Sequence, residues 1–183
     1  MYESFARGLR KMRIAILYTT IGGTTRECAE LLKRELTNQS VELFDVSERE
    51  PHLADFDAVV LGFPIIMGKA AKPMRKYIKL HKDELKDARA AYYICCGFVD
   101  CFEDYVKRTI PDELRESAID ATCLGGSLDP TRFKGINKMI VKSVRADILG
   151  GGDNGDERRD VSLPTIFEEN ISQLADKIKK SAE

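Results

Sequence analysis

The stretch that most constrains how this chain can fold is residues 19–25 (TTIGGTT), which lies between an apolar run and an amphipathic run. Residues 14–18 (IAILY) lack the polar alternation of a half-exposed strand, so we expect a strand buried on both faces. Residues 27–36 repeat apolar side chains at helical spacing among charged ones, which predicts an amphipathic helix. A strand, a tight turn and a helix in this order aim unpaired backbone N–H groups and the positive end of the helix dipole at one point. The stretch therefore predicts an anion site, most simply for a phosphate.

Two common phosphate-binding loops do not fit this stretch. The loop that binds nucleoside triphosphates needs a Lys directly after its last Gly, but Thr24 follows Gly23. The dinucleotide-binding loop needs a third Gly three residues after the second, where this chain has Arg26. Both of these ligand classes are therefore disfavoured.

What remains is a set of Thr hydroxyls and Gly amides around a terminal phosphate. Each charge-assisted hydrogen bond contributes about 1.5–3 kcal/mol, against about 0.3–1 kcal/mol for the helix dipole, so hydrogen bonds would hold the phosphate. An alternative stays open, in which Thr24 or Thr25 only caps the helix and the glycines only form the turn.

Residues 16–29 (ILYTTIGGTTRECA) resemble the FMN phosphate loop of flavodoxins, and in particular that of the flavodoxin-like protoporphyrinogen oxidases. The resemblance runs over about residues 12–178. It implies FMN as the cofactor and an α/β fold, namely a doubly wound five-stranded parallel sheet of order 2-1-3-4-5 with helices on both faces.

The order of the apolar runs favours the same fold class. Strands and helices that alternate along a chain need right-handed crossovers and a parallel sheet, which binds ligands beyond the carboxyl ends of its strands. The length of 183 residues fits one domain over 1–183, with 1–12 as an N-terminal extension. The expected strands are 14–18, 41–46, 58–61, 90–96 and 118–124.

The loop expected after the third strand is apolar where a loop is normally polar. Residues 62–69 read GFPIIMGK, and a flat, weakly charged ring such as isoalloxazine would explain the exposed apolar side chains. By resemblance this is the second flavin loop of the family. We expect Lys69 near the pyrimidine edge of the ring, where it would stabilise an anionic reduced flavin. The alternative, that these residues only pack on neighbouring loops, stays open.

A third loop, residues 97–100 (GFVD), follows the fourth strand. The resemblance implies that it closes over the flavin, with backbone groups of Gly97 and Phe98 at the pyrimidine side. Asp100 is expected to cap the helix over 101–109. No catalytic residue is identified. The predicted cofactor-binding residues are Thr19, Thr20, Ile21, Gly22, Gly23, Thr24, Thr25, Pro64, Ile65, Ile66, Met67, Gly68, Lys69, Gly97, Phe98, Val99 and Asp100.

Residues 131–146 distinguish this chain from a minimal flavodoxin. Five cations and no acids alternate with apolar residues, which predicts a basic amphipathic helix inserted after the fifth strand. Such a helix could lie on an anionic membrane, bind propionate-bearing substrates at the mouth of the flavin site, or face solvent.

The remaining helices are expected over 72–85, with His81 in a structural role, and over 101–109, ended by a break at 111–117. A closing helix is expected to begin at 162–164, after a Gly-rich acidic turn at 150–156.

Composition limits the classes of function. With 29 basic and 30 acidic residues the chain is nearly neutral, so net charge does not indicate nucleic acid as a partner. Residues 1–12 lack the apolar core of a secretion signal, and no run is long enough to span a membrane. We therefore expect a cytoplasmic protein, with peripheral contact at the inner face of the membrane through 131–146 as an open possibility.

The cysteines and histidines argue against a metal site. Five Cys, an odd number, favour reduced thiols, and with only two His there is no recognisable zinc spacing, so no metal is predicted. Cys95, Cys96 and Cys123 are expected in the core, whereas Cys101, at the start of a helix, is the thiol expected to be reactive.

Three functions follow from these residues. The first is an FMN oxidoreductase that takes two electrons from an organic reductant, by resemblance protoporphyrinogen, and passes them to a quinone or another acceptor. The second is a flavodoxin-type carrier that docks to larger redox proteins. Dedicated carriers are strongly acidic, so the near-neutral charge and the basic segment favour the enzyme. The third is an FMN-free module that binds a partner; the oligomeric state is not predicted.

Overall fold

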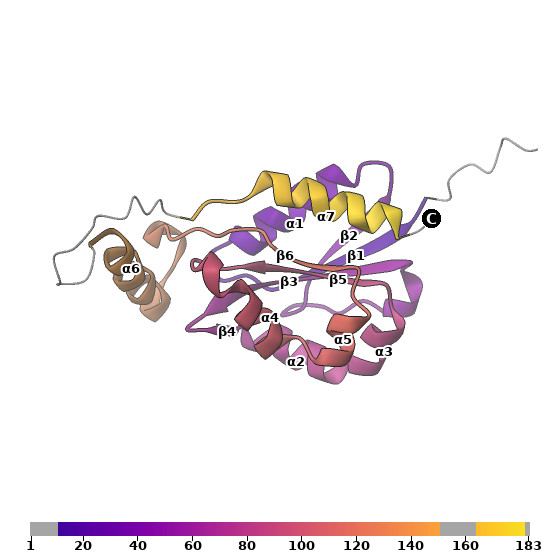
Figure 1. Cartoon of the computed structure of the whole chain (residues 1–183), viewed down its shortest axis with the longest axis horizontal. Coiled ribbons are helices and arrows are strands. Elements are labelled where there is room, and N and C mark those ends of the chain that lie inside the picture. Colours follow the sequence, from indigo (N-terminus) through magenta and orange to yellow (C-terminus); the bar gives the residue numbers. More distant parts are fainter. Residues whose placement is uncertain (1–10, 151–163, 182–183) are drawn as a thin grey trace, which may run out of the picture.

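The computed structural model describes residues 11–150 and 164–181, whose central element is a parallel sheet with helices on both faces (Figure 1). The five long strands follow the order β2-β1-β3-β5-β6, and each neighbouring pair is parallel. This is the predicted order 2-1-3-4-5, which is confirmed. The strands are β1 Arg13–Tyr18, β2 Ser40–Asp45, β3 Ala58–Ile66, β5 Ala90–Cys95 and β6 Asp120–Cys123, and a short β4, Lys69–Ala70, pairs antiparallel with the end of β3.

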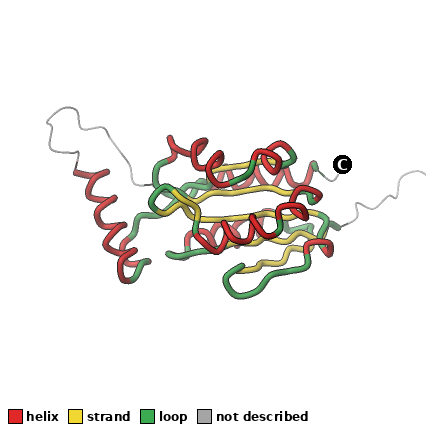
Figure 2. Tube along the Cα trace, turned by 90° about the horizontal axis from the view of Figure 1, so that it is seen from below, coloured by secondary structure: helices red, strands yellow, loops and turns green. Residues whose placement is uncertain are grey.

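The helices divide between the two faces of the sheet, and α6 lies at its end (Figures 1 and 2). α1 and α7 cover one face, and α2 to α5 cover the other. The helices are α1 Thr24–Glu35, α2 Lys72–Leu80, α3 Lys82–Asp87, α4 Phe102–Thr109, α5 Asp112–Glu116, α6 Gly135–Gly150 and α7 Glu168–Lys180, with the 3₁₀ turns η1 Leu53–Asp55, η2 Val99–Cys101 and η3 Pro130–Arg132.

Strand β1 shows how the sequence builds two cores at once. Successive side chains of a strand point to opposite faces, so an unbroken apolar run supplies both. Ile14 and Ile16 pack with the apolar residues of α1 and α7, whereas Ala15 and Leu17 pack with those of α2 to α5. The strand is buried on both faces, as its composition predicts.

The apolar stretch over 62–69, predicted to be a loop, is a hairpin instead. β3 continues to Ile66, turns at Met67 and Gly68, and returns as β4 through the pairs Ile65↔Ala70 and Ile66↔Lys69. Met67 and Gly68 have φ of 49° and 73°, and two residues with positive φ suit a two-residue hairpin turn. The apolar residues therefore continue a strand.

The helix predicted over 72–85 is divided at His81 into α2 and α3. The His81 ring stacks on Tyr77 at 4.3 Å, and its two nitrogens lie 3.0 Å from Glu84 and 3.3 Å from Glu50. These contacts agree with the structural role expected for His81. Likewise, the predicted break at 111–117 contains the short helix α5.

Three predicted helix starts are wrong. The inserted basic helix begins at Gly135 rather than at residue 131, because the turn η3 precedes it. Asp100 lies inside the turn η2, and α4 follows Cys101 without a side-chain cap. The closing helix begins at Glu168 rather than at 162–164, because residues 165–167 run extended against the end of β6. There Gly126 N donates to Thr165 O at 3.2 Å, and Phe167 N donates to Leu124 O at 3.2 Å.

Two further predictions fall mostly outside the described residues. These are the N-terminal extension up to residue 10 and the Gly-rich turn from residue 151 onward. Met12, placed in the extension by the prediction, is buried, and its carbonyl accepts from Ser40 N at 2.8 Å. Met12 therefore packs in the core and is hydrogen-bonded to β2, directly before β1 begins.

Candidate functional site

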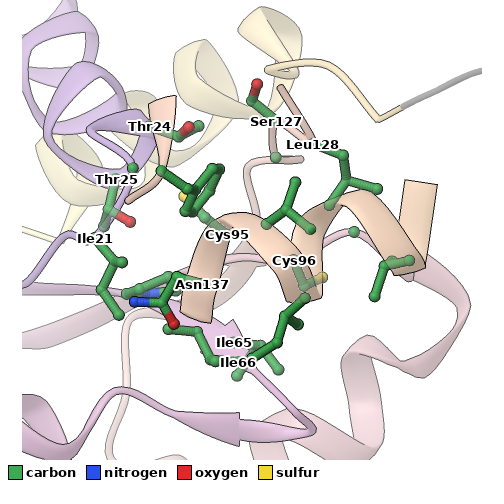
Figure 3. A pocket seen from close by; sticks show the side chains of 18 of the residues that line it. Ile21, Thr24, Thr25, Ile65, Ile66, Cys95, Cys96, Ser127, Leu128 and Asn137 are labelled. Atoms are coloured by element: carbon green, nitrogen blue, oxygen red, sulfur yellow. The ribbon is translucent and has the colours of Figure 1, made fainter. Parts of the chain in front are cut away.

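A cavity of about 230 Å³ opens at the carboxyl ends of β1, β3 and β5, where the winding of the sheet reverses. Loops after these strands form one wall, and α6 forms the opposite wall (Figure 3). The lining residues are Thr20, Ile21, Gly22, Thr24, Thr25, Pro64, Ile65, Ile66, Met67, Gly68, Cys95, Cys96, Gly97, Phe98, Tyr105, Gly126, Ser127, Leu128, Phe133, Asn137, Ile140, Val141 and Val144.

The loop after β1 presents free backbone donors to this cavity. Gly23, with φ of 83°, turns the chain into α1, and its own N–H donates to the Thr20 hydroxyl at 3.0 Å. Within residues 11–150 and 164–181, no protein group accepts from the amides of Thr24 and Thr25. Because the first amides of a helix have no partner in the helix, these donors are available to an anion.

The threonines of this loop have different surroundings. The N-cap of α1 is Gly23, without a side-chain cap bond, so neither Thr24 nor Thr25 serves as the cap. Both are buried and line the cavity, and Figure 3 shows them together on one side of it. Thr19 is also buried, but its hydroxyl lies 3.4 Å from that of Ser47, and it does not line the cavity.

The hairpin after β3 contributes the apolar side of the cavity. Residues 64–68 line it, with Ile65 and Ile66 half-buried and Met67 79% exposed. Lys69, predicted to lie near the ring, is exposed and is not among the lining residues.

The segment after β5 contributes Gly97 and Phe98, whereas Val99 and Asp100 do not line the cavity. Ahead of them, Cys95 and Cys96 bring two thiols to the wall (Figure 3). Cys95 Sγ lies 3.7 Å from Cys28 Sγ, and Cys96 Sγ lies 3.6 Å from Cys123 Sγ. The hydrogen bond with Cys28 and burial raise the pKa of Cys95, so this thiol stays protonated at neutral pH.

The cavity is almost free of charge. Among the described residues, no Asp, Glu, Lys, Arg or His lines it; its polar side chains are hydroxyls, thiols and the Asn137 amide. Burial raises the pKa of Tyr105, so its phenol is also neutral at pH 7. The site can therefore bind a flat ring and a phosphate, but its lining offers no acid or base that titrates near neutrality.

The inserted segment forms the wall that the sequence predicted least well. Asn137, Ile140, Val141 and Val144 line the cavity, whereas Ile136 and Met139 are 72% and 71% exposed. α6 is thus not a helix with all of its apolar residues turned inward. It stands off the end of the sheet in both views (Figures 1 and 2).

Several lining residues had no place in the predicted site. Gly126, Ser127 and Leu128 follow β6, and Tyr105 comes from α4. The pair Gly125–Gly126 at the end of the fifth predicted strand was a signal for a fourth loop at the same edge. Nothing comparable pointed to Tyr105, which reaches the cavity from a helix.

Two other features are absent from residues 11–150 and 164–181. No three His, Cys, Asp or Glu side chains there come together in a way that could hold a metal ion. None of the described helices is both long enough and apolar enough to cross a membrane.

The curated relatives match only a part of the chain. The protoporphyrinogen IX dehydrogenase [quinone] of Escherichia coli strain K12 is 31% identical over 86 residues, which are 45% of this chain and 47% of that protein. The proteins of the same name from strains CFT073 and O157:H7 match equally. The match therefore spans about half the length of these relatives.

Solved structures share the fold at low identity. A Fusobacterium nucleatum flavodoxin bound to flavin mononucleotide gives a TM-score of 0.53 at 13% identity, covering 93% of this chain and 98% of that one. The flavodiiron core Flv1 of Synechocystis sp. PCC6803 gives 0.53 at 15% identity, covering 95% and 37%. The model of the flavodoxin domain family matches residues 15–154. The chain belongs to the flavodoxin domain family.

Proposed function

We propose that this protein binds FMN in the cavity and oxidises an organic substrate, protoporphyrinogen IX, two electrons at a time. The observation that carries the proposal is one cavity with unpaired amides at the start of α1 and an uncharged, largely apolar wall beyond them. FMN has the same two parts, a terminal phosphate and a flat ring. The family match over residues 15–154 and the flavodoxin neighbour bound to flavin mononucleotide support the same cofactor.

The lining residues fit FMN in chemical character, and the size of the cavity requires α6 to move outward. Pockets for small molecules typically measure about 300–1,000 Å³, more than the 230 Å³ found here. The loops after β1, β3 and β5 are fixed to the sheet, whereas α6 stands off the end of the sheet (Figures 1 and 2). We therefore expect α6 to move outward when the ligand enters.

Each wall would then have a separate task. The amides of Thr24 and Thr25 and the hydroxyls beside them would hold the phosphate, and the hairpin 64–68 with Gly97 and Phe98 would flank the ring. The bound ring supplies the redox chemistry. Since no lining side chain titrates near pH 7, the protein's contribution is to bind, to orient and to exclude water.

The substrate is proposed from the E. coli relatives, which are named protoporphyrinogen IX dehydrogenase [quinone]. In each oxidation two electrons and two protons leave the porphyrinogen, and a quinone that accepts both becomes a quinol. Lys142 and Arg145, on the helix that bounds the cavity, would attract the propionates of the substrate. Charge-neutral substrates would lose that attraction.

The experiment for this proposal compares protoporphyrinogen with its dimethyl ester under anaerobic conditions, with a quinone as acceptor. We expect turnover of both substrates and a lower KM for the free acid. In K142A/R145A, the KM for the acid should rise, while that for the ester stays unchanged. No quinone-dependent oxidation of either substrate by the FMN-loaded protein would contradict the proposal.

A second candidate, an electron carrier without its own substrate, is favoured by the apolar rim of the cavity. Ile21, Met67 and Phe98 are 40%, 79% and 47% exposed, as a docking surface for a redox protein would require. Stepwise anaerobic reduction separates the two candidates. Two well-separated one-electron potentials would support the carrier, a single two-electron potential would support the enzyme, and failure to bind FMN would leave only a partner-binding module.

We also place the protein in the cytoplasm, in contact with the inner face of a membrane, where lipophilic quinones reside. Ile136 and Met139 are exposed on α6 among Lys134, Lys138 and Lys142. Exposed apolar residues flanked by lysines suit an anionic bilayer surface. Cosedimentation with phosphatidylglycerol vesicles, but not with phosphatidylcholine vesicles, is expected, and I136D/M139D should abolish it. Equal sedimentation with both vesicles would contradict this placement.

A further inference from the structure

The inserted segment brings one guanidinium to the phosphate loop. Arg132, the last residue of η3, donates from Nη1 to Thr24 Oγ1 at 3.1 Å and from Nη2 to Glu27 Oε2 at 2.7 Å. These partners lie 108 and 105 residues away in the sequence, in the first turn of α1. The guanidinium therefore lies beside the free amides at the start of that helix.

Arg132 has donors to spare for a ligand. A guanidinium carries five N–H donors, of which the contacts with Thr24 and Glu27 use two. The side chain is 35% exposed, so solvent and small ligands can reach it. Since Arg pairs with phosphate through two parallel N–H groups, the remaining donors suffice for a bidentate contact.

The position of Arg132 is fixed from within its own segment. Asp129 caps η3 by accepting from Thr131 N at 2.9 Å and Thr131 Oγ1 at 2.7 Å, and Arg132 N donates to Asp129 O at 3.2 Å. The next residue, Phe133, packs so closely on Gly22 that a Cβ there would lie 2.5 Å from Cζ of the ring. The segment is thus seated on the phosphate loop at two adjacent residues.

Acidic side chains lie near the phosphate loop, so a cation is needed there if a phosphate is to bind. Glu27 lies in the first turn of α1, so a phosphate held by the start of that helix would meet a nearby carboxylate. Asp129, whose backbone carbonyl accepts from Arg132 N, adds a second acid to this segment. Arg132 contacts both Glu27 and Thr24 of the loop, where its charge would offset the repulsion of a phosphate dianion.

We propose that Arg132 binds the terminal phosphate of the flavin cofactor, so that the inserted segment makes the chain selective for FMN over riboflavin. This inference rests on the proposed function, in which FMN occupies the cavity. A bound phosphate would also hold η3 more firmly on the loop after β1.

The test titrates the purified protein with FMN and, separately, with riboflavin, and follows flavin fluorescence. In R132A, the Kd for FMN should rise roughly 10- to 100-fold, as expected for a lost charged hydrogen bond, with no change in the Kd for riboflavin. R132K keeps the charge but loses the planar guanidinium, so its Kd for FMN should lie between those of R132A and the unmodified protein. K138A removes an exposed charge from the same segment and should leave both Kd values unchanged.

The variant Glu27→Gln distinguishes two roles of Arg132, namely binding the phosphate and only holding the inserted segment in place. If Arg132 binds phosphate, E27Q removes a repulsion, and the Kd for FMN should fall or stay the same. If the Arg132–Glu27 ion pair only holds the segment in place, E27Q and R132A should weaken both flavins alike, and that result would overturn the inference. Equal FMN binding by R132A and the unmodified protein would also overturn it. Failure of the unmodified protein to bind FMN would instead overturn the proposed function itself.

Discussion

The two walls of the cavity are built by different means. The first wall, residues 18–25, 62–68 and 95–98, continues strands whose backbones are hydrogen-bonded to neighbours and whose side chains enter the core. The second wall, η3 and α6, lies at the end of the sheet and touches the first through Arg132, Phe133 and the lining residues of α6. The difference suggests that the first wall sets the stability of the site and the second sets access and selectivity.

The largest expected effect lies beneath the first wall. Leu17 is completely buried one residue before the end of β1, so L17A should lower the free energy of unfolding by about 2–5 kcal/mol. Urea denaturation followed by circular dichroism measures this. A loss below about 1 kcal/mol would show that the first wall is less firmly built than its burial indicates.

The reactivity of the five thiols is an independent measure of how firmly the first wall is built. Cys101 is exposed, whereas Cys28, Cys95, Cys96 and Cys123 are buried. We expect one thiol to react rapidly with Ellman's reagent in the native protein, and the other four to react only on unfolding. C101S should remove the fast phase. Rapid reaction of Cys95 or Cys96 would mean that the first wall opens without global unfolding.

A smaller effect is expected from the second wall. Ile140 is half-buried on the cavity side of α6, so I140A should change the free energy of unfolding by about 1 kcal/mol or less. The association rate of FMN, measured by stopped-flow fluorescence, should rise because the moving wall becomes smaller. Destabilisation equal to that of L17A would remove the distinction between the walls.

The smallest effect concerns the cap that holds η3. The hydrogen bonds from Thr131 N and the Thr131 hydroxyl lower the pKa of Asp129 from its ordinary value of 3.8. A lowered carboxyl pKa means that the cap is fully formed above the ordinary value and is lost as the pH falls through the lowered one. The amide resonance of Thr131 should therefore titrate with a midpoint below 3.8. A midpoint at or above that value would contradict the capped geometry.

The contrast between the two walls also explains which parts of the structure could be predicted from the sequence. β1, β3 and β5 and the loop 19–25 were predictable because their signals are local, as uninterrupted apolar runs and a turn before an amphipathic helix. Of the predicted site residues, twelve line the cavity, and Thr19, Gly23, Lys69, Val99 and Asp100 do not.

Two of the errors lie where a distant partner decides the structure. His81 ends α2 while bound to Glu50, and residues 165–167 stay extended because they pair with the end of β6. The contact of Arg132 with Thr24 joins residues 108 apart, so no short motif announces it. A basic helix was predictable, but not which of its apolar residues would face the cavity.

The most direct test of the account is an amide chemical-shift titration of ¹⁵N-labelled protein with FMN, because it reports where the phosphate is held. We predict saturation at one equivalent, with the largest shifts at Gly22, Thr24 and Thr25, and with smaller shifts at Arg132 and Phe133. Absence of shifts at residues 19–25, whether FMN binds elsewhere or not at all, would contradict the account.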